Sequence, residues 1–157
     1  MSPTDAFAFL ALFAAAWTGV CWLLAGAGGW RTLARHYGQG DRPFEGDTRR
    51  FCRVSFGLLA NYGRTLAAGR GPEGIRLALA PLIVVAHPPL LIPWADVGPP
   101  TIRGRGPLRT AEFRFARAPE VAVRVTASLA QWLLEAHPDA STPGRSKKAL
   151  DTIPSNP

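Results

Sequence analysis

The sequence has few of the residues that cross-link small domains through disulfides or bind metal ions. It contains two cysteines, Cys21 and Cys52, in 157 residues. Two are too few for a disulfide scaffold or a four-cysteine zinc site. The three histidines, His36, His87 and His137, stand far apart and lack metal-ligand spacing with either cysteine. We therefore expect neither a metal nor a cofactor.

Long stretches suited to a soluble helix are also scarce. Fifteen prolines and sixteen glycines would interrupt almost any long helix, which excludes an all-helical bundle. The length allows one compact domain at most, once a membrane segment and tails are set aside. We therefore expect one mainly β domain.

Charged side chains are missing from residues 6–30, AFAFLALFAAAWTGVCWLLAGAGGW. A helix of that length would be about 37 Å long, enough to cross a hydrocarbon core of about 30 Å. The run predicts an uncleaved transmembrane helix after a short external N-terminus, residues 1–5. The alternatives are a buried core helix and a signal peptide cleaved after Ala27, which would release a secreted domain. No Lys or Arg precedes the run, and it is long for a signal peptide, so we favour the anchor.

The distribution of positive charge predicts the orientation. All eighteen Lys and Arg residues follow the apolar run, and six arginines come soon after it: 31, 35, 42, 49, 50 and 53. Positive residues near a span tend to stay in the cytoplasm. We therefore expect a single-pass protein of the cell membrane whose C-terminal part is cytoplasmic.

Residues 31–50 are predicted to form a basic juxtamembrane linker, helical through Tyr37 and then a loop. Its arginines would each add about 1 kcal/mol of attraction to anionic headgroups close to the surface. Nearby acidic residues dilute this charge, which favours a topology signal alone. We name Trp30, Arg31 and Arg35 as candidate contacts with the membrane or a partner.

Residues 51–138 are predicted to form the domain. Strands are expected over 51–59, 65–68, 75–80, 90–92, 112–115 and 121–125, from alternating apolar and polar residues between Gly- and Pro-rich turns. Ala118-Pro119-Glu120 is expected as a turn. A closing helix would be capped by Thr126 or Ser128 and would bury Trp132. The tail, residues 139–157, has too little apolar content to fold, so we expect it to be disordered.

Residues 81–86 allow two interpretations. The uncharged run around them is too short to span a membrane and contains Pro81. It is either a central strand buried on both faces or a loop that contacts the bilayer or a partner. In the second case Leu82, Ile83 and Val84 join the candidate contacts.

Motifs that carry chemistry are scarce. Gly69, Gly71 and Gly74 match G-x-G-x-x-G, but Pro72 lies inside the motif and an alternating strand follows it, which argues against a nucleotide site. The net charge of +7 raises nucleic acid as a partner. Because the arginines are spread among strands without a stacking pattern of aromatic residues, nucleic-acid binding is disfavoured.

The order of elements resembles a known architecture. Several short strands followed by one amphipathic helix, with Gly74-Ile75-Arg76-Leu77 and later Ile92-Pro93-Trp94, resemble small bacterial membrane proteins with a pleckstrin-homology-like (GRAM-type) domain. The resemblance covers about residues 51–137 and brings no catalytic motif. It implies an antiparallel sheet or partly open barrel with a C-terminal helix, acting as a binding or scaffolding module.

These observations favour a membrane-anchored, non-enzymatic module that faces the cytoplasm. Its partners would be the lipid membrane, through lipid headgroups, or another membrane protein. The alternative from a different class is a membrane-tethered enzyme whose site includes His87 and Asp96. Hydrogen-bond reach between these two side chains would favour the enzyme, and wide separation would favour the module.

Overall fold

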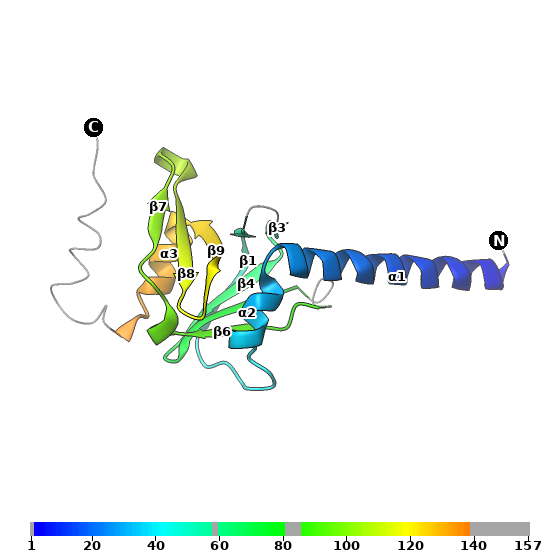
Figure 1. Ribbon diagram of the computed structural model, residues 1–157, viewed down its shortest axis with the longest axis horizontal. Coiled ribbons are helices and arrows are strands. Elements are labelled where there is room, and N and C mark those ends of the chain that lie inside the picture. The colour runs from blue at the N-terminus through cyan, green and yellow to red at the C-terminus, as the bar shows by residue number, and fades with distance from the viewer. Residues whose placement is uncertain (1, 58–59, 81–85, 139–157) are drawn as a thin grey trace.

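A computed structural model of the chain describes residues 2–57, 60–80 and 86–138, and it shows one long helix leaving a β-rich domain (Figure 1). The helices are α1 (Pro3–Ala27), α2 (Trp30–Tyr37) and α3 (Ala127–Leu134), with short 3₁₀ turns η2 (Trp94–Asp96) and η3 (Gly106–Leu108). The strands are β1 (Asp47–Cys52), β2 (Val54–Phe56), β3 (Ala60–Asn61), β4 (Leu66–Arg70), β5 (Gly74–Leu79), β6 (Leu90–Pro93), β7 (Thr101–Arg103), β8 (Thr110–Phe115) and β9 (Ala118–Thr126).

The apolar run forms α1, which is long and apolar enough to cross a membrane. A capping box starts it: Ser2 N–H donates to Asp5 Oδ2 at 3.0 Å, and Asp5 N–H donates to Ser2 Oγ at 3.3 Å. The helix ends at Ala27, three residues earlier than the predicted span. Gly29 turns the chain with a φ of 77°, and a Cβ there would lie 2.8 Å from Val121 Cγ2. The turn therefore requires glycine.

The domain consists of two antiparallel sheets. Their strand orders are β1-β4-β5-β6 and β3-β2-β9-β8-β7. The single strand predicted over 51–59 is wrong, because the chain leaves the first sheet at Cys52 and enters the second at Val54. The crossing follows Phe51, whose φ of 59° is left-handed and breaks the strand.

Two predicted hairpins are present. β4 and β5 pair from Leu66 with Leu79 to Arg70 with Ile75. β8 and β9 also pair, but their turn lies earlier than expected, since Phe115 already faces Ala118. Residues 118–120, predicted as a turn, are therefore the first residues of β9.

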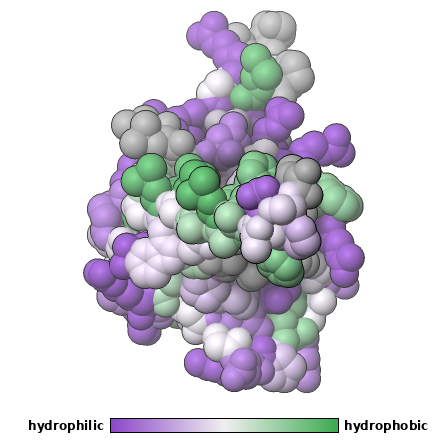
Figure 2. Space-filling view, turned by 90° about the vertical axis from the view of Figure 1, so that its right-hand side faces the viewer, coloured by the Kyte–Doolittle hydropathy of each residue, from purple (hydrophilic) through white to green (hydrophobic). Residues whose placement is uncertain are grey.

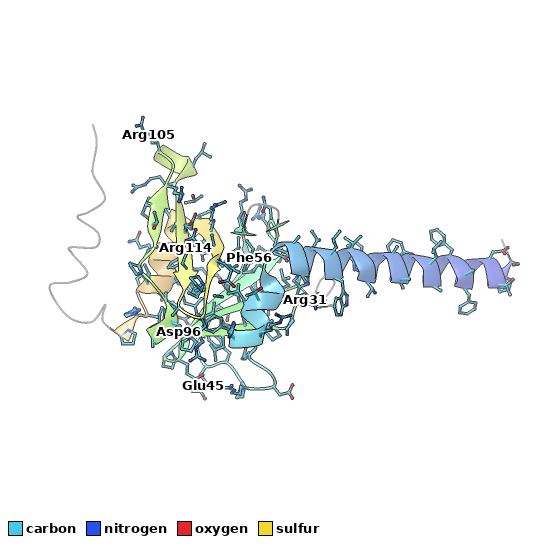
Figure 3. All side chains as sticks on the ribbon, in the orientation of Figure 1. Arg31, Glu45, Phe56, Asp96, Arg105 and Arg114 are labelled. Carbon is cyan, nitrogen blue, oxygen red and sulfur yellow. The ribbon has the colours of Figure 1, made fainter. Side chains whose placement is uncertain are left out.

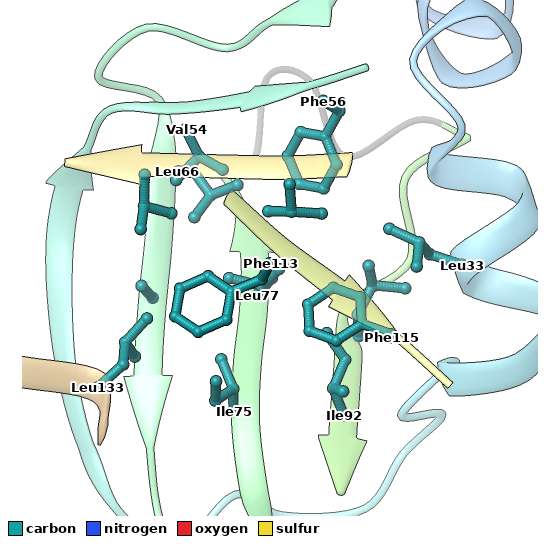
Figure 4. Close-up of a cluster of buried hydrophobic side chains, with 14 of the residues drawn as sticks. Leu33, Val54, Phe56, Leu66, Ile75, Leu77, Ile92, Phe113, Phe115 and Leu133 are labelled. Carbon is teal, nitrogen blue, oxygen red and sulfur yellow. The ribbon is translucent and has the colours of Figure 1, made fainter. Parts of the chain in front are cut away.

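One core lies between the sheets, where strands of the second sheet run across those of the first (Figure 4). Trp132 belongs to it, as predicted, together with Phe113, Phe115, Val121, Val123 and Leu133. Helix α3 closes this core. Its N-cap is Thr126, whose hydroxyl accepts a hydrogen bond from Leu129 N–H at 3.3 Å.

Helix α2 is part of the domain rather than of a linker. Leu33 and Tyr37 are buried in the same core, and the N–H of Gln39, just after the helix, donates to Pro89 O at 2.8 Å. The expected linker over 31–50 is thus corrected, since α2 covers one end of the sheets and β1 begins at Asp47. The tail 139–157 lies outside the described residues, and its disorder stays a prediction.

The predicted fold class is confirmed at its coarser level. The chain has an N-terminal apolar helix, two antiparallel sheets and a C-terminal helix, in an arrangement consistent with an open sheet. The resemblance to pleckstrin-homology-like domains stays a prediction.

Candidate functional site: anchor junction and basic depression

Four rings pack where α1 meets the domain, and we call them the junction cluster: Trp30, Phe56, Tyr62 and His87. The Trp30 ring centroid lies 5.0 Å from that of Phe56, 5.7 Å from Tyr62 and 5.4 Å from His87. Its Nε1–H donates to Pro88 O at 3.1 Å. Trp30 is completely buried, so its prediction as a membrane contact is wrong. An indole that packs among three rings with its N–H satisfied stays inside the protein.

A hydrogen bond joins two polar groups inside this cluster. Tyr62 Oη lies 2.8 Å from His87 Nε2, and His87 has no exposed surface. Burial raises the pKa of the Tyr62 hydroxyl to about 12, because the phenolate loses its hydration there. The pair thereby satisfies both side chains in an apolar setting.

The last turns of α1 pack against the domain. Cys21 and Ala25 are buried, and Ala25 belongs to the domain core. Cys21 apart, the large apolar side chains from Phe7 to Leu24 are instead exposed, Phe7 at 74% and Leu23 at 72%. The helix therefore has two parts, an exposed apolar part and a part that forms one body with the domain.

Arg31 lies at the base of α1 (Figure 3). Its guanidinium carbon is 4.6 Å from the centroid of the Trp22 ring, a cation–π contact that connects α2 to α1. Arg35, one turn later, is exposed. Viewed along α1, apolar side chains gather at the centre and hydrophilic ones surround them (Figure 2). Both arginines stay candidates for contact with a membrane surface.

The three other predicted contacts, Leu82, Ile83 and Val84, lie outside the described residues. The choice between a buried strand and a bilayer-facing loop for this stretch stays a prediction. The described neighbours, Ala80 and Ala86, are both partly buried.

A second candidate site lies on the surface next to the junction, and we call it the basic depression. It is a hollow of about 350 Å³ lined by Arg49, Arg50, Arg53, Arg64, Phe51, and the hydroxyl residues Thr126 and Ser128. All four arginines are exposed. Within the described ranges, no carboxylate forms an ion pair with any of them.

The local backbone explains why consecutive arginines share this hollow. In a regular strand, neighbouring side chains point to opposite faces. The pairing of β1 with β4 shifts register between Arg49 and Cys52, and such a bulge redirects side chains. Arg49, Arg50 and Phe51 therefore all line the hollow, and the Arg49 guanidinium also stacks on Trp132 at 4.4 Å.

A different group of arginines, on the second sheet, shares one carboxylate. Glu112 is buried, and its carboxylate lies 3.0 Å from Arg124 Nε, 3.0 Å from Arg114 Nη2 and 3.2 Å from Arg103 Nε. The hydrogen bond from Arg124 and the other two guanidinium groups lower the pKa of Glu112, although burial opposes them.

The two residues of the alternative enzyme hypothesis take part in different groups of contacts. His87 belongs to the buried junction cluster, whereas Asp96 Oδ2 lies 2.9 Å from Arg117 Nε. Asp96 also helps to raise the pKa of Tyr37, mainly a result of burial. In the part of the chain that the structure describes, no group of three or more His, Cys, Asp or Glu residues is placed to hold a metal ion.

None of the three comparisons, with protein-family models, with curated proteins and with solved structures, found a match.

Sequence reasoning missed the basic depression. Arg49 and Arg50 were counted within the basic linker and the charge that sets orientation, Arg53 only within that charge, and Arg64 was not singled out. The doublet Arg49-Arg50 beside Phe51 was a signal in the sequence. Nothing in the sequence, however, indicated that Arg64 and the start of α3 would join it.

Proposed function

We propose that the chain is a single-pass protein of the cell membrane. Its β-rich domain is held against the cytoplasmic surface and acts by binding rather than by catalysis. The ligands we propose are lipid headgroups or a membrane-protein partner. The supporting observation is the division of α1 into an exposed apolar part and a part, with Cys21 and Ala25, that packs into the domain.

The packing of Ala25 favours an anchor over a cleaved signal peptide. Cleavage after Ala27 would remove a residue of the domain core and expose the surface that it covers. The exposed side chains from Phe7 to Leu24 would be a large apolar surface in water. A bilayer removes that cost, because a helix from Phe7 to Leu24 spans about 27 Å, close to the thickness of the hydrocarbon core of about 30 Å.

A binding role is supported by the character of the two candidate sites. The junction cluster is buried, so His87 is closed to a substrate, and the basic depression offers positive charge with no His, Asp or Glu among its described lining residues. The resemblance to pleckstrin-homology-like domains, which implies an antiparallel sheet or partly open barrel with a C-terminal helix, also favours a binding module.

Membrane integration is tested on the full chain expressed in bacteria. After alkaline carbonate washing we expect it to stay in the membrane pellet, and mass spectrometry should find residues 1–27 still attached. A protein released by the wash, or one beginning at Gly28, would contradict the proposal.

Orientation is tested separately with reporters fused after Pro157. A reporter that is active in the cytoplasm should work, and one that requires export should not. Replacing Arg31, Arg35, Arg49 and Arg50 by glutamine should weaken or invert this orientation. An exported C-terminus in the unmodified chain would overturn the cytoplasmic placement while leaving membrane integration intact.

A further inference from the structure

We propose that the basic depression binds a phosphate group, and that its position favours the headgroup of an anionic phospholipid as the source. This inference deepens the proposed function and depends on it for the choice of lipid. The site itself rests on the residues around the hollow, which is why free phosphate serves as a separate probe.

The first support is the chemistry of the lining. Arg50, Arg53 and Arg64 come from two separate segments and converge on one hollow without an ion pair to a described carboxylate. Guanidinium groups bind phosphate oxygens through paired hydrogen bonds. The contrast with Glu112, which pairs with three arginines, indicates that this positive charge is left for an external anion.

The second support is the start of α3. Its N-cap, Thr126, and the hydroxyl of Ser128 line the same hollow. The first backbone N–H groups of a helix and its dipole favour negative charge at this end. Helix α3 therefore adds to the arginines rather than opposing them.

The third support is Phe51. The residue is 70% exposed, and its φ of 59° places it in a backbone region that non-glycine residues rarely adopt. Such strain concentrates at functional sites. An exposed aromatic ring beside arginines suits the boundary between headgroups and acyl chains.

The location favours a lipid as the ligand. Arg53 and Arg64 flank Val54–Phe56 and Tyr62, and the rings of Phe56 and Tyr62 contact Trp30 at the base of α1. Figure 1 shows β3, which precedes Arg64, next to the end of α1. The domain is fixed to the C-terminal end of α1 at this point. The depression should therefore lie near the headgroups of the leaflet from which this end of α1 emerges.

The test uses the full chain in nanodiscs of phosphatidylcholine with phosphatidylglycerol. After extraction in mild detergent, mass spectrometry measures the ratio of the two lipids that stay bound. Arg53→Gln with Arg64→Gln should reduce the enrichment of phosphatidylglycerol by about fivefold per arginine, from about 1 kcal/mol for each charge near the surface. The matched control, Arg42→Gln with Arg105→Gln, removes two exposed arginines outside the depression and should keep the enrichment.

The second arm separates a lipid from free phosphate. Inorganic phosphate is titrated calorimetrically into the full chain in nanodiscs of phosphatidylcholine alone. For a lipid site, Phe51→Ser should reduce the enrichment of phosphatidylglycerol and leave phosphate binding unchanged. Phosphate binding without lipid enrichment would support the site and overturn the lipid as its source.

The proposal is overturned if the depression variant and the control lose equal lipid enrichment, or if neither lipid nor phosphate binds the unmodified chain. These outcomes are distinct from failure of the proposed function, which is judged by membrane retention and the attached N-terminus. The phosphate arm can also be run in detergent, so it does not require that α1 spans a membrane.

Discussion

The junction cluster and the basic depression are formed by neighbouring residues in the sequence, but the first is buried and apolar and the second is exposed and positively charged. Two residues lie between Arg53 and Phe56, and one lies between Tyr62 and Arg64, so the chain passes from exposed arginine to buried ring within a few positions. On one side, rings exclude water and connect α1 to the domain. On the other, guanidinium groups remain in water with no described carboxylate beside them.

This difference separates two roles. Burial of large rings stabilises the folded chain, whereas exposed positive charges contribute little to stability or oppose it by mutual repulsion. We therefore expect substitutions in the junction cluster to change the free energy of unfolding, and substitutions in the basic depression to change binding. The following experiments test that division, beginning with the largest expected effect.

The largest effect should come from removing α2. A fragment 42–138 lacks the buried side chains of Trp30, Leu33 and Tyr37. Full burial of one large apolar side chain contributes about 1.5–3 kcal/mol, so the total loss is comparable with a domain's whole stability of about 5–15 kcal/mol. Fragment 42–138 should fail to fold, while 29–138 should show a cooperative thermal transition by circular dichroism. Equal transitions for the two would mean that α2 is dispensable.

A single substitution tests the junction more finely. Trp30→Ala removes the central ring and leaves Pro88 O without its donor, so we expect a loss of about 3–5 kcal/mol in the free energy of unfolding. Denaturant unfolding of the full chain in micelles measures this. Phe7→Ala, at a side chain 74% exposed on α1, is the control and should stay within about 0.5 kcal/mol.

The buried hydroxyl of Tyr62 should make the junction sensitive to alkaline pH. Its pKa of about 12 exceeds the usual value of about 10 for tyrosine in an unfolded chain. The stability from keeping Tyr62 neutral is therefore fully present below pH of about 10 and is lost as pH rises toward about 12.

Absorbance of the phenolate follows the titration, because the chain has only two tyrosines. Tyr62→Phe should remove the part of the absorbance change that occurs near pH 12. The absorbance change of Tyr37 should remain, and burial raises the pKa of that hydroxyl as well. A full two-tyrosine signal at the usual pKa in the folded chain would show that the junction is open to water.

The smallest stability effect should come from the basic depression. Arg53→Gln with Arg64→Gln removes no buried side chain and no ion pair to a described carboxylate. We expect a change within about 0.5 kcal/mol, as for most surface substitutions. As a contrast, Glu112→Gln should lower Tm measurably, since it leaves three arginines around a neutral side chain. A large decrease in the free energy of unfolding of the double variant would show that these arginines stabilise the fold.

The sequence predicted local features well where one segment contains the whole signal. The apolar run forms α1, the alternating residues form the β4–β5 and β8–β9 hairpins, and Thr126 caps α3. These depend on periodicity and capping within a few residues. The predicted strand over 51–59 was wrong because Phe51 adopts a left-handed φ, which no pattern of apolar residues encodes.

The prediction for Trp30 was wrong for a related reason. A tryptophan at the end of an apolar run is typical both of a membrane interface and of a protein core. The position of Gly29 decides between them, since its left-handed turn directs the chain back onto Val121 and places Trp30 among Phe56, Tyr62 and His87.

The sequence by itself determined that a long apolar helix precedes a basic, mainly β domain, because hydropathy and charge accumulate along the chain. Only the tertiary structure decided that α2 belongs to the core and that the end of α1 packs into the domain. It also decided that Arg49, Arg50, Arg53 and Arg64 meet at the start of α3. The physical reason is that burial and convergence depend on contacts between distant segments, which the order of residues does not display.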